Sequence, residues 1–100
     1  MKTFEFNNHQ MHIQQGRYGN NRTALLFVDA QTGETYLTAT INTPKQHLDP
    51  GEICIKTWDE NEGVLEFLIS EGIVSESKYS FPVGLGFAIV HVVELLTTDF

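Results

Sequence analysis

The side chains that could do chemistry in this chain are four histidines, one cysteine and a run of acids. His9 and His12 stand three residues apart, a spacing that joins them on one side of a helix but separates them across a strand. Asn7-Asn8 favours a tight turn that leads into a strand. We therefore expect no shared metal ion, and we interpret both as turn and edge-strand histidines.

Cys54 could act as a nucleophile if a histidine served as its base. It lies between Ile53 and Ile55, where a thiol usually packs as a small apolar side chain, and no flanking motif of a cysteine hydrolase surrounds it. One cysteine also excludes an intramolecular disulfide and a multi-cysteine zinc site. His91 lies within an apolar segment, which is typical of a hydrogen-bonded core histidine. We predict no catalytic residue.

Two further stretches resemble ligand loops only in part. Gly84-Leu85-Gly86 is half of a dinucleotide-binding motif, but it lacks the third glycine and comes before a strand instead of a helix. We interpret it as a strand entry or a bulge. The stretch 59–63 (DENEG) has acids and a glycine as an EF-hand loop does, but its glycine comes too early and no glutamate closes the loop. We expect neither a metal nor a cofactor.

The net charge of −7 is concentrated in one part of the chain, because residues 49–76 hold eight of the thirteen acids. Nucleic-acid binding needs clustered lysine and arginine, so we expect no direct binding to DNA or RNA. The simpler interpretation of the acids is solubility and compensation of a helix dipole. The sharper one is a surface that imitates phosphates and binds the basic groove of another protein.

Seven residues are therefore candidates for contacting a partner protein. Four are the acids at and beyond the expected helix start, namely Asp59, Glu60, Glu62 and Glu66. Three lie in the cationic turn GRYGNNR, where arginine and tyrosine are residue types enriched at binding hot spots, namely Arg17, Tyr18 and Arg22. A plain hairpin tip is the simpler interpretation of this turn.

Alternating apolar residues predict two hairpins in the first half of the chain. The first joins residues 3–6 to residues 9–15 through Asn7-Asn8, with Phe4 opposite Met11. The second joins residues 23–30 to residues 34–41 through a turn with Gly33 in the left-handed conformation. Residues 42–51 are expected to be a connector, because proline restricts the residue before it.

One helix is predicted, from Asp59 to Glu71. Asp59 and Glu62 resemble a capping box, four aliphatics follow at helical spacing, and Gly72 with Ile73 suits a Schellman end. The segment 52–58 is expected to be a short strand. The segment 87–96 is expected to be a strand buried on both faces, because it is almost continuously apolar.

Together these elements predict an α+β fold, with an antiparallel β-meander sheet and one amphipathic helix packed on a face. Length favours a single domain over residues 1–100. The N-terminus lacks the apolar run of a signal peptide, and the longest apolar run, 87–93, is too short to span a bilayer. A lone thiol fits a reducing compartment, so we expect a cytoplasmic protein that does not enter a membrane.

Three stretches carry a resemblance, namely KTFEFNNHQ, GRYGNNRTALLFVDAQTGETYLTATINTP and ENEGVLEFLISEGIV. They are similar to a family of short bacterial proteins of unknown function carried on phages, plasmids and conjugative elements. The resemblance implies an accessory role in a mobile element of a bacterium. It rests on turn glycines and a capped helix, so it carries no functional residue across.

Two functions of different classes remain open. The first is a non-enzymatic protein that binds another protein through the acidic surface, as an inhibitor or decoy. The alternative is a small-ligand-binding or catalytic domain with a pocket on the second sheet face, near Leu26, Val28, Tyr36 and His91. Association of two copies through the apolar part of that face is a separate hypothesis.

Overall fold

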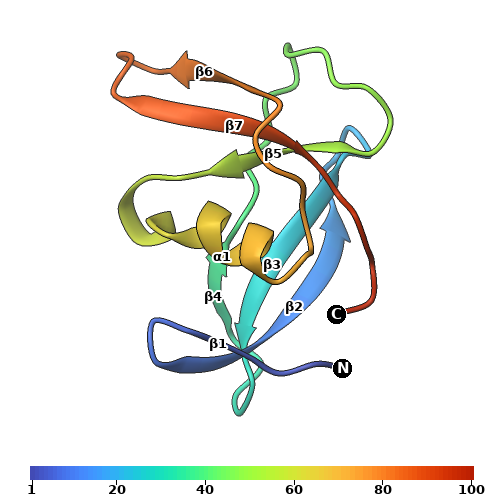
Figure 1. The fold of residues 1–100 in the computed structure, drawn as a ribbon, viewed down its shortest axis with the longest axis vertical. Coiled ribbons are helices and arrows are strands. Elements are labelled where there is room, and N and C mark those ends of the chain that lie inside the picture. Colours follow the sequence, from blue (N-terminus) through green and yellow to red (C-terminus); the bar gives the residue numbers. More distant parts are fainter.

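The computed structural model describes residues 1–100 and contains two antiparallel sheets with one short helix between them (Figure 1). The four-stranded sheet has the order β1-β2-β3-β4, with bounds Phe4–Phe6, His9–Arg17, Thr23–Asp29 and Thr35–Thr38. The three-stranded sheet has the order β5-β7-β6, with bounds Glu52–Lys56, Ala88–Glu94 and Tyr79–Val83. The helical segments are a 3-10 turn, η1 (Asp59–Asn61), and a helix, α1 (Val64–Ser70). The predicted fold class is confirmed.

The first predicted hairpin is confirmed in its register. Phe4 pairs with Met11 and Phe6 with His9. Asn7 and Asn8 have φ values of 50° and 64°, the conformation that a type I′ turn requires and that asparagine tolerates. The strand that follows runs two residues further than expected, because β2 pairs with β3 as far as Arg17.

The second predicted hairpin is also confirmed, with one irregularity. Phe27 pairs with Leu37 as expected, and Gly33 has a φ of 75°. The register shifts between Phe27 and Val28, so that Val28 pairs with Thr35 instead of Tyr36. This bulge leaves Tyr36 outside the regular ladder, with 38% of its surface exposed.

The strand β6 was not predicted, because Pro82 and neighbouring serines weaken its pattern. Proline cannot donate to a strand ladder, but it is tolerated at the edge of a sheet. Here β6 is an edge strand, with Pro82 opposite Ile89 on β7. Gly84 and Gly86 lie in the turn between β6 and β7 at φ values of 61° and 87°. They form the hairpin turn that leads into β7 at Ala88, so the predicted strand entry is confirmed.

The predicted helix start at Asp59 is wrong. Asp59 has a φ of 55°, and the helix begins only at Val64, after Gly63 at a φ of 87°. No side chain caps either helical segment, so the capping box is absent. The physical reason is a tertiary contact: Asn61 is fully buried and its side-chain amide donates to the carbonyl of Thr38 at 2.7 Å. That contact holds the segment in a 3-10 turn instead of the first turn of a helix.

The predicted helix end is confirmed. Gly72 has a φ of 72°. The amide of Ile73 donates to the carbonyl of Leu68, and the amide of Gly72 donates to the carbonyl of Ile69, both at 3.0 Å. This pair of bonds is the Schellman arrangement, which satisfies carbonyls at the helix end.

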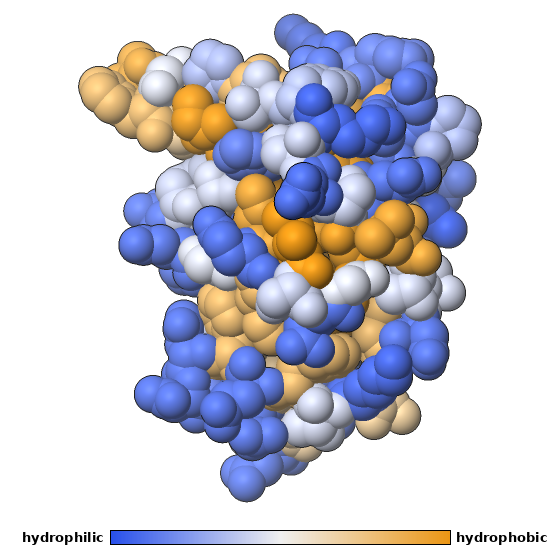
Figure 2. All heavy atoms as spheres, in the orientation of Figure 1, coloured by the Kyte–Doolittle hydropathy of each residue, from blue (hydrophilic) through white to orange (hydrophobic).

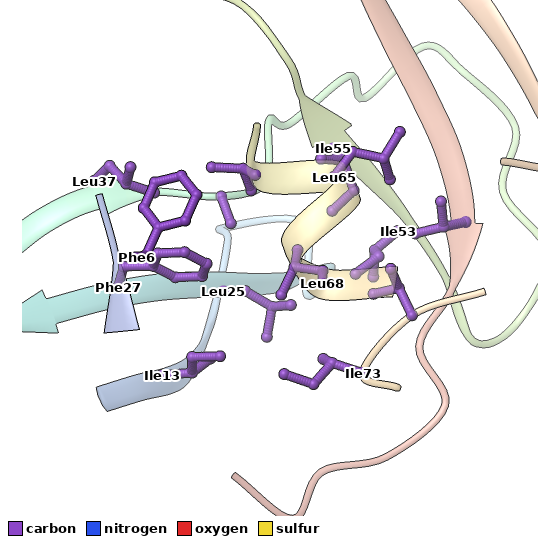
Figure 3. Close-up of a cluster of buried hydrophobic side chains, with 14 of the residues drawn as sticks. Phe6, Ile13, Leu25, Phe27, Leu37, Ile53, Ile55, Leu65, Leu68 and Ile73 are labelled. Carbon is purple, nitrogen blue, oxygen red and sulfur yellow. The ribbon is translucent and has the colours of Figure 1, made fainter. Parts of the chain in front are cut away.

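A core of fifteen buried residues takes side chains from both sheets and from α1 (Figure 3). Leu68 of α1 is fully buried between Leu25 of β3 and Ile53 of β5. Phe67, outside the predicted apolar stripe, packs against three aromatic rings at centroid distances of 5.4 to 5.9 Å, namely Phe4, Phe6 and Phe27. The helix therefore joins the two sheets through one apolar layer.

The predicted strand 87–96, buried on both faces, is confirmed only in part, because both faces of β7 are buried at Val92 and Val93 whereas Phe87 before its start is exposed. Val93 belongs to the main core, whereas Val90 and Val92 form a second small cluster with Cys54. Ile89, nearer the hairpin, is exposed. The two sheets are also linked by backbone bonds, because the amide of Lys56 donates to the carbonyl of Ala39 at 3.0 Å.

Large apolar side chains are exposed at the tip of the β6–β7 hairpin, where Figure 2 shows apolar atoms projecting from the body of the molecule. Leu85 and Phe87 are each 91% exposed. The chain ends lie near each other (Figure 1), and the Lys2 ammonium is 3.5 Å from the Asp99 carboxylate. None of the helices has the length and apolar character needed to cross a bilayer.

Candidate functional site

Three of the predicted partner-binding acids gather around one shallow hollow. Asp59 and Glu60 belong to η1, and Glu62 follows it; all three are exposed. The hollow has a volume of about 490 Å³ and is completed by Asn7 of the β1–β2 turn, Tyr36 of β4 and the backbone of Gly63. We call it the acidic hollow. Glu66 is exposed on the first turn of α1 and does not line it.

The charge of the acidic hollow is only partly compensated. Glu60 accepts a hydrogen bond from the Lys56 ammonium at 2.6 Å, and this bond lowers the pKa of the Glu60 carboxyl. Lys56 also lies 5.6 Å from the ring centre of Trp58. Asp59 and Glu62 take part in none of the four ion pairs of the chain. The surface therefore keeps free carboxylates that face solvent.

An aromatic side chain borders these acids. The ring of Tyr36 lies 4.6 Å from the ring of His9, and the His9 ring is hydrogen-bonded to the carbonyl of Asn7. The bulge in β4 is the reason that Tyr36 reaches this place, since it removes the residue from the regular alternation of the strand. Acids and an exposed aromatic ring thus share one surface.

The second set of candidates, in the β2–β3 turn, is tied to the protein by neutral partners. The Tyr18 hydroxyl is 2.8 Å from the Thr40 hydroxyl. The Arg22 guanidinium donates through Nη1 to the carbonyl of Thr43 at 2.6 Å and through Nη2 to the carbonyl of Gln46. Tyr18 and Arg22 therefore anchor the connector that follows β4, and neither extends freely into solvent.

Arg17 and Arg22 also lie at one side of a separate cleft of about 300 Å³. We call it the arginine cleft. Its opposite side is the segment from Leu48 to Ile53, and Leu95 completes the apolar part. It contains two acids, Asp49 and Glu52. The structure does not join the two predicted surfaces, because the acidic hollow and the arginine cleft share no lining residue.

The carboxylate of Glu52 is almost completely buried, with 4% of the side chain exposed. It lies 2.7 Å from the Lys78 ammonium and accepts a bond from the Asp49 amide at 2.8 Å. The bond from Lys78 is the main reason that the pKa of Glu52 is lowered, and the same bond raises the pKa of Lys78. Glu52 is a structural anion and already has its cation.

The cysteine and three of the histidines form hydrogen bonds within the protein. Cys54 is buried, its thiol lies 3.2 Å from the Thr43 hydroxyl, and burial raises the pKa of the thiol. This placement confirms the small apolar role. His91 is half-buried and bonded to the Ser77 hydroxyl at 2.8 Å. The rings of His9 and His12 are bonded to different backbone carbonyls, and no group of three metal-ligating residues comes together.

The second sheet face has a different character from the one expected. Val28 is buried, Leu26 is half-buried, and Tyr36 is the exposed member of the set. Of the three hollows on the surface, none contains Leu26, Val28 or His91. The third hollow lies between residues 43–46 and residues 81–83. The two most exposed large apolar side chains, Leu85 and Phe87, therefore lie at the β6–β7 hairpin and not on the β3–β4 pair.

No family model matches the chain, and no curated protein or solved structure matches it either. The resemblance to short proteins of mobile elements therefore stays a prediction.

Sequence reasoning missed the lining of both surfaces. Asn7 and Tyr36 reach the acidic hollow from two separate hairpins, and Leu95 reaches the arginine cleft from the C-terminal end. A bulge at Tyr36 leaves no local signal in the sequence. The sequence predicts a connector over residues 42–51, and nothing in its pattern places the residues after Leu48 beside Arg17.

Proposed function

We propose that the protein is a non-enzymatic accessory protein of a bacterial mobile element that binds another protein through the acidic hollow. The partner presents a basic surface, and the protein acts on it as an inhibitor or decoy. One observation carries this proposal: Asp59 and Glu62 are exposed, free of ion pairs and next to an exposed aromatic ring.

The chemistry of the acidic hollow fits a lysine or arginine side chain from the partner. Carboxylates accept charge-assisted hydrogen bonds from such a cation, and the face of a tyrosine ring attracts a cation. Clustered charge of one sign also increases the rate of encounter with a surface of opposite sign. Glu66, one turn further along the chain, extends the negative surface.

The position of these acids favours binding without refolding. Glu62 and Glu66 form no side-chain hydrogen bond or ion pair within the protein, so their charge can be changed without removing an internal contact. The surface is carried by β1, β4 and the start of α1. The strand β1 pairs with β2, β4 pairs with β3, and Val64 at the start of α1 is fully buried. The surface is therefore carried by segments that are anchored in the sheet and the core.

The test is a pull-down from bacterial lysate with the wild-type chain, with Glu62→Lys/Glu66→Lys, and with Glu34→Lys/Glu76→Lys. All four glutamates are exposed, and both double variants change the net charge equally. The proposal predicts a protein captured by the wild type and by the Glu34/Glu76 control, lost from the Glu62/Glu66 variant, and released by high salt.

Thermal unfolding of both variants serves as the control for folding, and the melting temperatures are expected to stay close to that of the wild type. Equal capture by the two double variants would mean that the charge acts without regard to its position. That outcome, or capture that high salt does not weaken, contradicts a role for the acidic hollow.

A further inference from the structure

The two arginines of the chain lie together without a negatively charged partner. The four ion pairs use three lysines and one histidine as cations, and no carboxylate lies within ion-pair distance of Arg17 or Arg22. This is unusual in a chain with thirteen acids and six cationic side chains. A guanidinium is always charged and its planar fork matches an oxyanion. The unpaired charges therefore point to an anion from outside the chain.

Neutral groups hold both guanidinium groups in place. Arg22 donates to the carbonyls of Thr43 and Gln46, and Arg17 donates through Nη1 to the carbonyl of Asn21 at 3.2 Å and to the hydroxyl of Thr23 at 3.3 Å. These bonds orient the side chains but leave their charge uncompensated. Donors that are fixed before binding lose less conformational freedom when a ligand arrives.

The acids of the arginine cleft do not supply the missing charge. Glu52 is bonded to Lys78 at 2.7 Å, and Asp49 Oδ1 lies 3.1 Å from the His47 ring nitrogen. Both carboxylates therefore have partners that lie outside the lining of the cleft. With Glu52 paired to Lys78, the two arginines outnumber the one exposed acid of the cleft, Asp49, and give it a net positive charge.

The rest of the cleft is mixed, with polar Asn21 and Thr23 on the arginine side and three apolar side chains opposite. Ile53 is buried, and Leu48 and Leu95 are half-buried beside it. The volume of about 300 Å³ is at the lower end of the range for small-molecule pockets. From the unpaired arginines beside the half-buried Leu48 and Leu95, we infer that the arginine cleft binds a small organic anion. Its carboxylate or phosphate group lies between Arg17 and Arg22, and its apolar part lies against Leu48 and Leu95.

The test is an NMR titration of the full chain with hexanoate and with hexanol, which has the same alkyl chain but no charge. The expected result is a saturable change in the amide signals of Thr23, Gly51 and Ile53 with hexanoate. Hexanol is expected to bind at least about tenfold more weakly, because charge-assisted hydrogen bonds to both guanidinium groups are lost.

Two variants test whether hexanoate binds in the arginine cleft. Arg17→Gln removes one guanidinium whose own bonds are to exposed groups, and it is expected to weaken hexanoate binding about tenfold or more while the spectrum stays that of the folded chain. Lys2→Gln loses the same charge away from the cleft, and its affinity is expected to equal that of the wild type. The inference is overturned if hexanoate produces no saturable change, if hexanol binds as tightly, or if Arg17→Gln binds hexanoate unchanged.

Discussion

Gly63→Ala distinguishes two descriptions of the acidic segment by the sign of its effect on stability. In the structure Gly63 has a φ of 87° and separates η1 from α1. If one helix ran from Asp59 to Glu71, as the sequence predicts, Gly63 would lie in its interior. Alanine is the better helix former, so the variant would then be more stable by about 1 kcal/mol.

The structure predicts the opposite sign. An added Cβ at Gly63 would meet only Phe6 Cε1, at 3.9 Å, which is an ordinary contact. The cost is therefore backbone strain alone, about 1–2 kcal/mol for a residue with a side chain in the left-handed region. For a domain of this length, each kcal/mol lowers the melting temperature by roughly 4–8 °C. Gly63→Ala is expected to melt roughly 4–16 °C below the wild type.

The assay is reversible thermal unfolding followed by circular dichroism, with urea unfolding to give the free energy. Gly19→Ala is the matched control, because Gly19 has no positive φ and an added Cβ there meets nothing within 4 Å. It is expected to be neutral or to stabilise by up to about 1 kcal/mol, through a less flexible unfolded chain. A Gly63→Ala variant that melts above the wild type would refute the break between η1 and α1.

Two further predictions concern the core and the buried ion pair. Leu68 is fully buried, so Leu68→Ala is expected to reduce the free energy of unfolding by about 2–5 kcal/mol in urea melts. The control is Leu85→Ala, which should leave urea unfolding unchanged because the Leu85 side chain is 91% exposed. Equal effects of the two variants would contradict the packing of α1. Because the pKa of Glu52 is lowered in the folded state, its contribution is fully present above its ordinary pKa of 4.5 and is lost as the pH falls through the lower folded value. Between about pH 5 and pH 3, the free energy of unfolding of Glu52→Gln, measured in urea, should therefore decrease less steeply with falling pH than that of the wild type. Equal pH dependence in the two proteins would contradict the Glu52–Lys78 pair.

Local patterns in the sequence determined the hairpins and one end of the helix. Asn7-Asn8 sets the first turn because both residues tolerate positive φ, and the alternation around it places Phe4 opposite Met11. Gly72 and the apolar residue after it specify the helix end through bonds only a few residues long. These features need no partner from elsewhere in the chain, so they could be predicted.

The start of the helix and the strand β6 were decided by tertiary contacts. The capping pattern at Asp59 is locally favourable and a cap contributes about 1 kcal/mol. The hydrogen bond from the Asn61 amide to the Thr38 carbonyl, a residue far away in sequence, holds the segment in another conformation. The strand β6 has a weak pattern because of Pro82, but its place at the edge of the sheet tolerates a residue without an N–H donor.

The same distinction between local sequence pattern and tertiary contact applies to the candidate sites. Charge is additive along a chain, so the sequence alone determined that residues 49–76 carry most of the acids and that two arginines flank one turn. Which charges remain unpaired depends on distances between segments far apart in sequence, such as Lys78 beside Glu52. Only the tertiary structure placed Tyr36 beside the acids of η1 and the side chain of Leu95 near Arg17, because pairing of strands decides which distant side chains become neighbours.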